Sequence, residues 1–353
     1  MKKNSKKLLS MMLAMMLVTG CSSGTAPNST GTSETTASAV AETQKAKSGD
    51  IINMGTGSVG GTDNTVIEAI SSVVNQKTSL RTSTVTTSGG AEIIYLMEEG
   101  SVQGGYTGTI DLVNALNGEA PFEKPIEQEY MLQGFGFVTW ALPVVVLDSS
   151  PIKEYADLEG KHIGLPPAAS STTAVLNLVL EAYGLTDKVT IDYFTWTEGY
   201  TALKDGRIDA FVGSYANGQP ISGLVEIEAT NAIRALAMDA EIGEKVKNRN
   251  AGVGIAFLTN AEVKTIPEGE EILAPSNSGI IVFNANVAEE DIYQYTKATI
   301  DHLSELQQIS SYFDAFQDVA TKVCVESVPF HPGAAKALKE AGLWEDRFIV
   351  YEK

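Results

Sequence analysis

Cysteine, histidine and basic side chains are the scarce groups in this sequence. Its 353 residues include 2 cysteines and 3 histidines, and 25 Lys and Arg stand against 44 Asp and Glu. The few histidines and cysteines show no metal-ligand spacing, so we expect neither a metal nor a cofactor. The net charge of −19 argues against nucleic acid as a partner and against adhesion of the folded body to anionic lipid.

The sequence also lacks a recognisable catalytic set. His162 lies in a predicted strand and His302 on a predicted helix beside Asp301. His331 precedes a proline in a turn, where we expect it to cap a structural element, and no Ser-centred nucleophile elbow accompanies it. We therefore predict that the protein is not an enzyme. A hydrolase that uses a loop hydroxyl is the weakest alternative, because it would need a base within reach.

No apolar run is long enough to span a bilayer. The run at Leu8–Val18 follows four lysines and ends in Leu17-Val18-Thr19-Gly20-Cys21, which resembles a bacterial lipobox. This pattern predicts that residues 1–20 are a lipoprotein signal peptide and that Cys21 carries lipid. Cleavage leaves 21 basic and 44 acidic residues, a net charge of −23. Lipid then holds an acidic protein at the bacterial cell membrane, outside the cytoplasm.

The segment after the lipidated cysteine has a linker composition. Residues 22–49 are rich in Ser, Thr, Ala and Gly and contain no aromatic residue, so residues 21–49 are predicted to be a lipidated, disordered tether. Cys324 is then the one remaining cysteine and cannot form an internal disulfide. Its apolar neighbours predict that it is a small buried side chain.

A strand, a glycine-rich turn and the start of a helix form the most informative stretch. Ile51–Met54 predicts a buried strand, Gly55–Gly61 the turn, and apolar residues at helical spacing follow as far as Val74. The free N–H groups at such a helix start favour an anion. The match to a dinucleotide fingerprint is weak, because no acidic residue ends the second strand. A turn that only packs a helix on a sheet is the alternative.

The remaining chain alternates predicted strands and helices, which indicates an α/β protein with parallel sheets. Pro143 interrupts an apolar segment at residues 134–147, so we predict a strand, a bend and a second strand there. Residues 166–173 repeat the first device, with small hydroxyl residues before a helix. Open α/β sheets bind ligands beyond the carboxyl ends of their strands, so the two loops could face one cleft.

Several phrases, in this order and spacing, resemble the TAXI family of solute-binding proteins, the extracytoplasmic receptors of TRAP transporters. They are Gly55-Thr56-Gly57 with Gly60-Gly61, Ser88-Gly89-Gly90-Ala91-Glu92, Leu158-Glu159-Gly160-Lys161, Gly164-x-Pro166 with Ser170-Ser171-Thr172, the stretch from Ala202 to Phe211, and Val328-Pro329-x-His331-Pro332-Gly333-Ala334. The resemblance covers residues 50 to about 345. Each phrase is weak alone, and the ordered set is specific.

The resemblance implies a two-lobed type II periplasmic-binding-protein fold, in which each lobe is a mainly parallel sheet flanked by helices. Residues 50–140 and 278–353 would form lobe I and residues 141–277 lobe II. The implied partners are a small anionic or zwitterionic solute, such as an organic acid or a glutamate-like amino acid, and a TRAP-type permease; a monomer is expected. The implied solute-binding residues are Thr56, Gly57, Ser58, Gly60, Ser88, Gly89, Tyr106, Thr107, Ser170, Ser171, Thr172, Tyr193 and Thr195.

The chain departs from the family pattern in both loops. Thr62-Asp63-Asn64 replaces an aromatic pair, and Ala169-Ser170-Ser171-Thr172 stands where Ser-Gly-Thr is common. Asp63 would repel a carboxylate if it faced the cleft, and we favour the alternative that it caps the helix. Arg81, Arg207 and Arg234 are the candidates for a second solute carboxylate. A structural, adhesive or sensory lipoprotein would share the anchor and the tether but would not need paired loops.

Overall fold

The computed structural model describes residues 51–59 and 61–352, and the α/β class predicted from the sequence is confirmed. The predictions for the signal peptide, Cys21 and the tether, and the one for Gly60, lie outside the described residues. None of the helices in the described part of the chain is long and apolar enough to cross a membrane.

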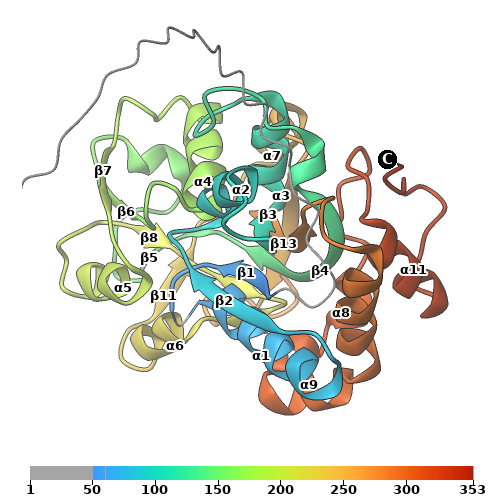
Figure 1. Cartoon of the computed structure of the whole chain (residues 1–353). Helices are drawn as coiled ribbons and strands as arrows, with labels where there is room; N and C mark the ends of the chain where they lie inside the picture. Colours follow the sequence, from blue (N-terminus) through green and yellow to red (C-terminus); the bar gives the residue numbers. More distant parts are fainter. Residues whose placement is uncertain (1–50, 60, 353) are drawn as a thin grey trace, which may run out of the picture. The chain divides into compact units, whose positions relative to one another are not determined.

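Three parallel strands, each followed by a helix, form one half of the main sheet in the order β3-β1-β2. The strands are β1 (Ile52–Thr56), β2 (Thr82–Thr86) and β3 (Gly104–Gly108), and the helices are α1 (Thr62–Lys77), α2 (Gly90–Glu98) and α3 (Thr109–Asn117). Helix α1 packs with α8 (Glu289–Asp301) and α9 (Leu303–Ile309), and α2 packs with α3 (Figure 1). The loops that leave β1 and β2 therefore open at one edge of the sheet.

The other half of this sheet is antiparallel, so the prediction of mainly parallel sheets is wrong for it. Strand β13 (Glu271–Phe283) pairs antiparallel with β3, with β4 (Leu132–Ala141) and with β12 (Val253–Thr259). Two short strands, β9 (Tyr215–Ala216) and β10 (Gln219–Pro220), extend the sheet beyond β4. Parallel order is confined to strands joined by a crossover helix, and β13 instead runs back through the sheet.

The middle of the chain forms two smaller sheets. Strand β5 (Val144–Leu147) pairs antiparallel with β8 (Phe211–Val212) and β11 (Ile233–Ala235), whereas β6 (His162–Leu165) pairs parallel with β7 (Thr190–Tyr193). A bridge between Ile163 and Ala210 joins the two sheets. The flanking helices are α4 (Ser171–Ala182), α5 (Trp196–Lys204), α6 (Ser222–Glu228) and α7 (Ala240–Arg249).

Two separate clusters of buried apolar side chains underlie these sheets. The first core, as we name it, draws on residues 52–138 and 280–348 with Ala216. The second core draws on residues 141–274 with Ile110. The chain passes between them at Leu142–Pro143, where the predicted strand, bend and second strand are confirmed as β4 and β5. The lobe ranges given above stay a prediction.

Two segments have elements that their sequence pattern does not mark. Residues 241–276, which show little pattern, contain α7, β12 and the first half of β13. The apolar residues at helical spacing over residues 288–306 belong to two helices, α8 and α9, because the backbone leaves helical values at His302, with φ −109° and ψ 22°. Further short elements are η1 (Gln128–Tyr130), η2 (Tyr155–Leu158), η3 (Ser311–Phe313), α10 (Phe316–Val319) and α11 (Pro332–Glu340).

The structural roles predicted for two scarce side chains are confirmed. His331 is buried at the N-cap of α11, and its Nδ1 accepts the Gly333 N–H at 3.3 Å. Cys324 is buried, and burial raises the pKa of its thiol to about 12, so it stays protonated and behaves as a small apolar side chain.

The first core should be most sensitive at Phe283 on β13. This ring is fully buried and packs against Tyr295 and His331 at centroid distances of 5.3 and 6.2 Å. We expect Phe283→Ala to lower the free energy of unfolding by about 3–5 kcal/mol, because it leaves a cavity. Urea denaturation measures this loss. The matched control is Phe257→Ala on β12, where the ring is 58% exposed and the change should stay within about 0.5 kcal/mol; equal losses would contradict the assignment of the core.

Candidate functional site

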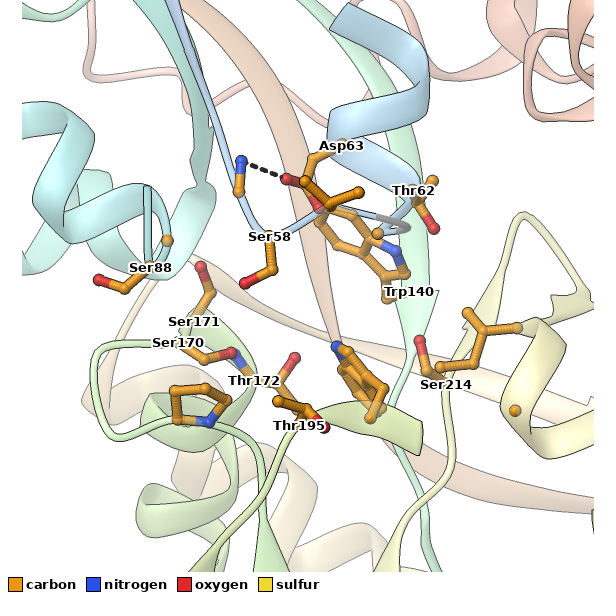
Figure 2. Close-up of a pocket in the computed structure, with 18 of the residues that line it drawn as sticks. Ser58, Thr62, Asp63, Ser88, Trp140, Ser170, Ser171, Thr172, Thr195 and Ser214 are labelled. Atoms are coloured by element: carbon orange, nitrogen blue, oxygen red, sulfur yellow. Dashed lines mark hydrogen bonds between the residues drawn. The ribbon is translucent and has the colours of Figure 1, made fainter. Parts of the chain in front are cut away.

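A cavity of about 280 Å³ opens where loops from the two cores meet. The first core supplies the β1–α1 and β2–α2 loops, and the second core supplies the β6–α4 and β7–α5 loops and the start of α6. Figure 2 shows the side chains around this space: Ser58, Thr62, Asp63, Ser88, Trp140, Ser170, Ser171, Thr172, Thr195 and Ser214. A concave site with convergent polar groups and aromatic walls is typical of a small-molecule binding site.

Asp63 dominates the wall that the β1–α1 loop forms. Its Oδ2 accepts the Gly57 N–H at 2.6 Å (Figure 2). The backbone N–H groups of Asp63 and Asn64 also donate to this carboxylate. Burial raises the pKa of Asp63 to about 6, against these hydrogen bonds. Gly57 leaves the room that this contact needs, because a Cβ there would lie 2.2 Å from Oδ2.

The sequence allows two interpretations of Asp63, as a cap of the helix or as a carboxylate that faces the cleft, and the structure agrees in part with each. It holds the start of α1 as the favoured interpretation predicts, although the N-cap residue itself is Gly61 and carries no side-chain cap. The same side chain also lines the cavity. A solute must consequently accommodate a carboxylate at the very position where the sequence suggests an anion site.

The β6–α4 and β7–α5 loops form the opposite wall, and both begin a helix with a hydroxyl cap. Ser170 Oγ accepts the Thr172 N–H at 3.2 Å at the start of α4. Thr195 forms a capping box with Glu198 at the start of α5. The hydroxyls of Ser170 and Thr195 therefore already make a hydrogen bond within the chain, and each can make a further hydrogen bond to a ligand.

A hydrogen bond behind the cavity connects the two cores. Ser171 Oγ, at the start of α4, donates to Asp111 Oδ2 on α3, and both side chains are buried. Burial raises the pKa of Asp111 to about 7, against the lowering effect of Ser171 and of the Gly108 N–H. Tyr106 lies close to both carboxylates, and its burial together with their charges raises its pKa well above the usual value. At neutral pH the Tyr106 hydroxyl is therefore protonated.

The loops from the two cores also touch through Gly89. Its φ of 153° lies in the region that side chains rarely adopt, and a Cβ there would lie 3.0 Å from the carbonyl oxygen of Ala169. Only glycine combines this backbone conformation with so close an approach. Gly89 itself is part of the cavity lining.

The structure brings most of the predicted binding residues together. Of the described ones, the cavity is lined by Gly57, Ser58, Ser88, Gly89, Tyr106, Ser170, Ser171, Thr172 and Thr195.

Three predicted residues lie outside the cavity. Thr56 and Thr107 are fully buried, and their hydroxyls donate to the carbonyl oxygens of Gly57 and Gly108. Tyr193 ends β7 with its ring 52% exposed, away from the lining. Thr107 directly follows the lining residue Tyr106 on β3, so strand alternation turns its side chain away from the cavity.

The remaining lining residues are not among the predicted binding residues, although one interpretation of the sequence places Asp63 at the cleft. They are Val59, Gly61, Thr62, Asp63 and Pro167 in or beside the predicted loops, and Trp140, Trp196, Thr197, Ser214, Ile221, Ser222, Gly223 and Asn277 elsewhere. Trp196 and Thr197 directly follow the predicted Thr195, so extending that prediction by two residues would have included them. Trp140, Ser214 and Asn277 lie on or beside strands whose pairing places them there, and no local motif marks them.

The cavity contains no basic side chain among the described residues. Arg81 is exposed and donates to its neighbour's carbonyl, Arg207 pairs with Asp205, and Arg234 bonds with Asp148. All three arginines lie outside the lining and cannot hold a solute carboxylate in this structure. Within the described part of the chain, no group of three or more His, Cys, Asp or Glu side chains could hold a metal ion.

The sequence model of the NMT1-like family matches residues 54–342. The periplasmic aliphatic sulphonate binding protein SsuA from Escherichia coli is 15% identical, over 78% of this chain and 81% of that chain, with a TM-score of 0.45. SsuA from Xanthomonas axonopodis pv. citri, bound to MOPS, is 15% identical over 85% and 96%, with a TM-score of 0.42. A ligand binding component of an ABC-type import system from Staphylococcus aureus, with zinc bound, is 12% identical over 85% and 96%, with a TM-score of 0.45.

The two buried carboxylates predict that stability falls as pH rises. The pKa values of Asp63 and Asp111 are higher in the folded chain than in the unfolded chain, so between about pH 4 and 7 the folded state holds protons that the unfolded state has released. Asp111→Asn should therefore be more stable than the unchanged protein at pH 8, by about 1 kcal/mol or more, and should lose that advantage near pH 4. Urea denaturation across this range tests it, with the exposed Asp314→Asn as control. Parallel pH profiles for all three proteins would contradict the interpretation.

Proposed function

The chain belongs to the NMT1-like family, and from this membership and the cavity we propose that it is the extracytoplasmic solute-binding receptor of a membrane importer. Lobe I is assigned to residues 50–140 and 278–353 and lobe II to residues 141–277, because the two cores follow nearly this division. The receptor captures a small solute between the lobes and releases it to a permease. It acts by binding alone.

One observation carries this proposal: both cores contribute walls to the same cavity. Ser58 and Ser88 follow strands of the first core, and Ser170 and Thr195 follow strands of the second core. A solute that contacts both sets stabilises the arrangement in which the lobes are together. A permease that recognises this arrangement can then distinguish the loaded receptor from the empty one.

The lining provides enough interactions for useful affinity. Hydroxyls of Ser58, Thr172 and Ser214 and the amide of Asn277 are available at the cavity, and Trp140 and Trp196 add aromatic area. A neutral hydrogen bond contributes about 0.5–1.5 kcal/mol net. Four to six such bonds with aromatic contact suffice for micromolar binding after the entropic costs of association.

The partner we favour is a TRAP-type permease, on the strength of the ordered TAXI-like phrases. Lipid on Cys21 would hold the receptor at the bacterial cell membrane, and residues 22–49 would give it reach. An ABC-type permease is the alternative partner. Uptake that collapses with the ion gradient while ATP is maintained would favour the TRAP-type partner, and uptake that follows ATP would exclude it.

The hydrolase alternative has one candidate, the Ser171–Asp111 pair. Its serine hydroxyl is buried and donates to the carboxylate, and no histidine takes part. His162 pairs with Asp192, His302 with Glu305, and His331 caps α11. A purely structural or adhesive lipoprotein would not require a polar cavity walled by both cores. The receptor therefore explains more of the structure than either alternative.

Tryptophan fluorescence can test the proposal directly. Trp140 and Trp196 line the cavity, whereas Trp344 packs against Phe330 and Phe348 in the C-terminal part of the first core. A screen of amino acids and small organic acids should identify a solute that changes the emission. At a hundredfold its dissociation constant, this solute should also add about 2.7 kcal/mol to the free energy of unfolding.

The three tryptophans provide matched controls. Trp344→Phe should keep the solute-dependent change in emission, and the double variant Trp140→Phe with Trp196→Phe should lose most of it. A signal that follows Trp344 instead would place binding elsewhere on the protein. If no solute in the panel alters either emission or stability, the receptor assignment is wrong or the solute lies outside these chemical classes, and native mass spectrometry of the purified protein for a retained small molecule decides between the two.

A further inference from the structure

The charged side chains among the described lining residues of the cavity are of one sign, negative. Asp63 is the only Asp, Glu, Lys, Arg or His side chain among the described lining residues. A solute that fills this space therefore meets an acidic group without a basic partner. In the low dielectric of a closed site, an unpaired carboxylate attracts a cation and repels an anion strongly.

The N–H groups at the start of α1 already donate to a carboxylate of the protein. Asp63 accepts the Gly57 N–H and those of its own first turn, so the N–H groups that would hold a solute carboxylate are occupied. The carboxylate still has unused acceptor capacity, since two oxygens offer about four lone-pair sites. Because Asp63 lines the cavity, a solute there can use this remaining capacity.

A second carboxylate strengthens the negative potential from behind. Asp111 lies buried beneath the wall, bonded to Ser171, and Tyr106 lies within the field of both acids. No basic side chain is bonded to either acid in the described residues, so Asp63 and the ionised fraction of Asp111 both make the potential at the cavity negative. A cation in the cavity would be favoured by both acids, and an anion would be opposed by both.

The aromatic lining fits a cation as well. Trp140 and Trp196 are partly exposed at the cavity, and Tyr106 lies in an edge-on arrangement with Trp140 at 6.3 Å between ring centroids. Aromatic faces attract ammonium and quaternary ammonium groups, with contributions of about 0.5–2 kcal/mol that grow as water is excluded. Carboxylate and rings together are suited to a positively charged nitrogen.

Hydrogen-bond donors lie at more than one place on the lining. Ser214 is 2% exposed and Asn277 1% exposed, and neither the Ser214 hydroxyl nor the Asn277 Nδ2 has a hydrogen-bond acceptor among the described residues. Ser214 lies across the cavity from Ser88 and from Ser170 and Ser171 at the start of α4 (Figure 2). Thr172, in the first turn of α4, is a donor on the α4 side, where a carboxylate or a carbonyl oxygen could bind.

We propose that the solute carries a positively charged nitrogen that binds between Asp63 and the rings of Tyr106, Trp140 and Trp196, with any acidic group directed to the α4 side. This inference deepens the proposed function and rests on it. The solute class becomes a neutral zwitterion, such as an amino acid with an uncharged side chain, or a simple cation. Dicarboxylates and 2-oxo acids without a nitrogen cation are excluded from tight binding.

Matched pairs of compounds test the inference on the unchanged protein. Alanine, leucine, glutamine and glutamate are each compared with the 2-hydroxy acid of the same skeleton, and choline with its neutral carbon isostere 3,3-dimethylbutan-1-ol. Isothermal titration calorimetry measures each dissociation constant. We expect the nitrogen-bearing member of every pair that binds to bind at least tenfold more tightly, and glutamine to bind more tightly than glutamate.

The variant Asp63→Asn then removes the charge while keeping an oxygen for the Gly57 N–H. It should weaken binding of the nitrogen-bearing compound tenfold or more and leave its uncharged analogue unaffected or tighter. Glu68→Gln is the control, because it removes one negative charge from an exposed position on the same helix and keeps an acceptor for Asn64. Its dissociation constants should stay within twofold, and thermal melts of the empty variants verify that both fold.

The outcomes separate this inference from the proposed function. Tighter binding of the hydroxy acids, or unchanged affinity in Asp63→Asn, would overturn the inference and leave the receptor function intact. It would show that Asp63 serves only to hold the start of α1. Failure of every compound in both charge classes to bind would count against the receptor function and the inference together.

Discussion

The hydrogen bond from Ser171 to Asp111 is the contact on which the arrangement of the site depends. It joins the first turn of α4 in the second core to α3 in the first core, out of contact with bulk water. Without this donor, the pKa of Asp111 would be higher still, and its negative charge would lack a compensating hydrogen bond. Gly89 of the first core also lies close to Ala169 of the second core, and the cavity has walls from both cores.

Local pattern accounts for the parts of the fold that the sequence predicts well. The helical spacing after Gly61 and the interruption at Pro143 act within a few residues, and the structure has α1 and the β4–β5 bend at those places. The direction of β13 has no such local mark. Its 13 residues pair antiparallel with three earlier strands, β3, β4 and β12, and this pairing makes the larger part of the main sheet antiparallel where alternation alone indicated parallel order.

The site divides in the same way. Loops that follow a strand and begin a helix are visible in a sequence, and Ser58, Ser88 and Ser170 line the cavity as that reasoning predicts. Trp140 and Asn277 lie opposite each other on neighbouring strands, in the register Asn277–Trp140 of β13 and β4. Only this register brings them to the cavity together, and a shift of one strand by one residue would turn one of the two side chains to the other face of the sheet.

The two strand–loop–helix devices look alike in sequence and differ in chemistry. At α4 a serine hydroxyl caps the helix, and a hydroxyl adds no charge. At α1 the residue that takes the same kind of N–H group is Asp63, which adds a full negative charge as it does so. A helix start attracts an anion only while its N–H groups are free. In α1 the N–H groups and the helix dipole stabilise the carboxylate of Asp63 instead of a carboxylate of the solute. Asp63 thus makes the potential at this wall negative, where free N–H groups at the helix start would make it positive.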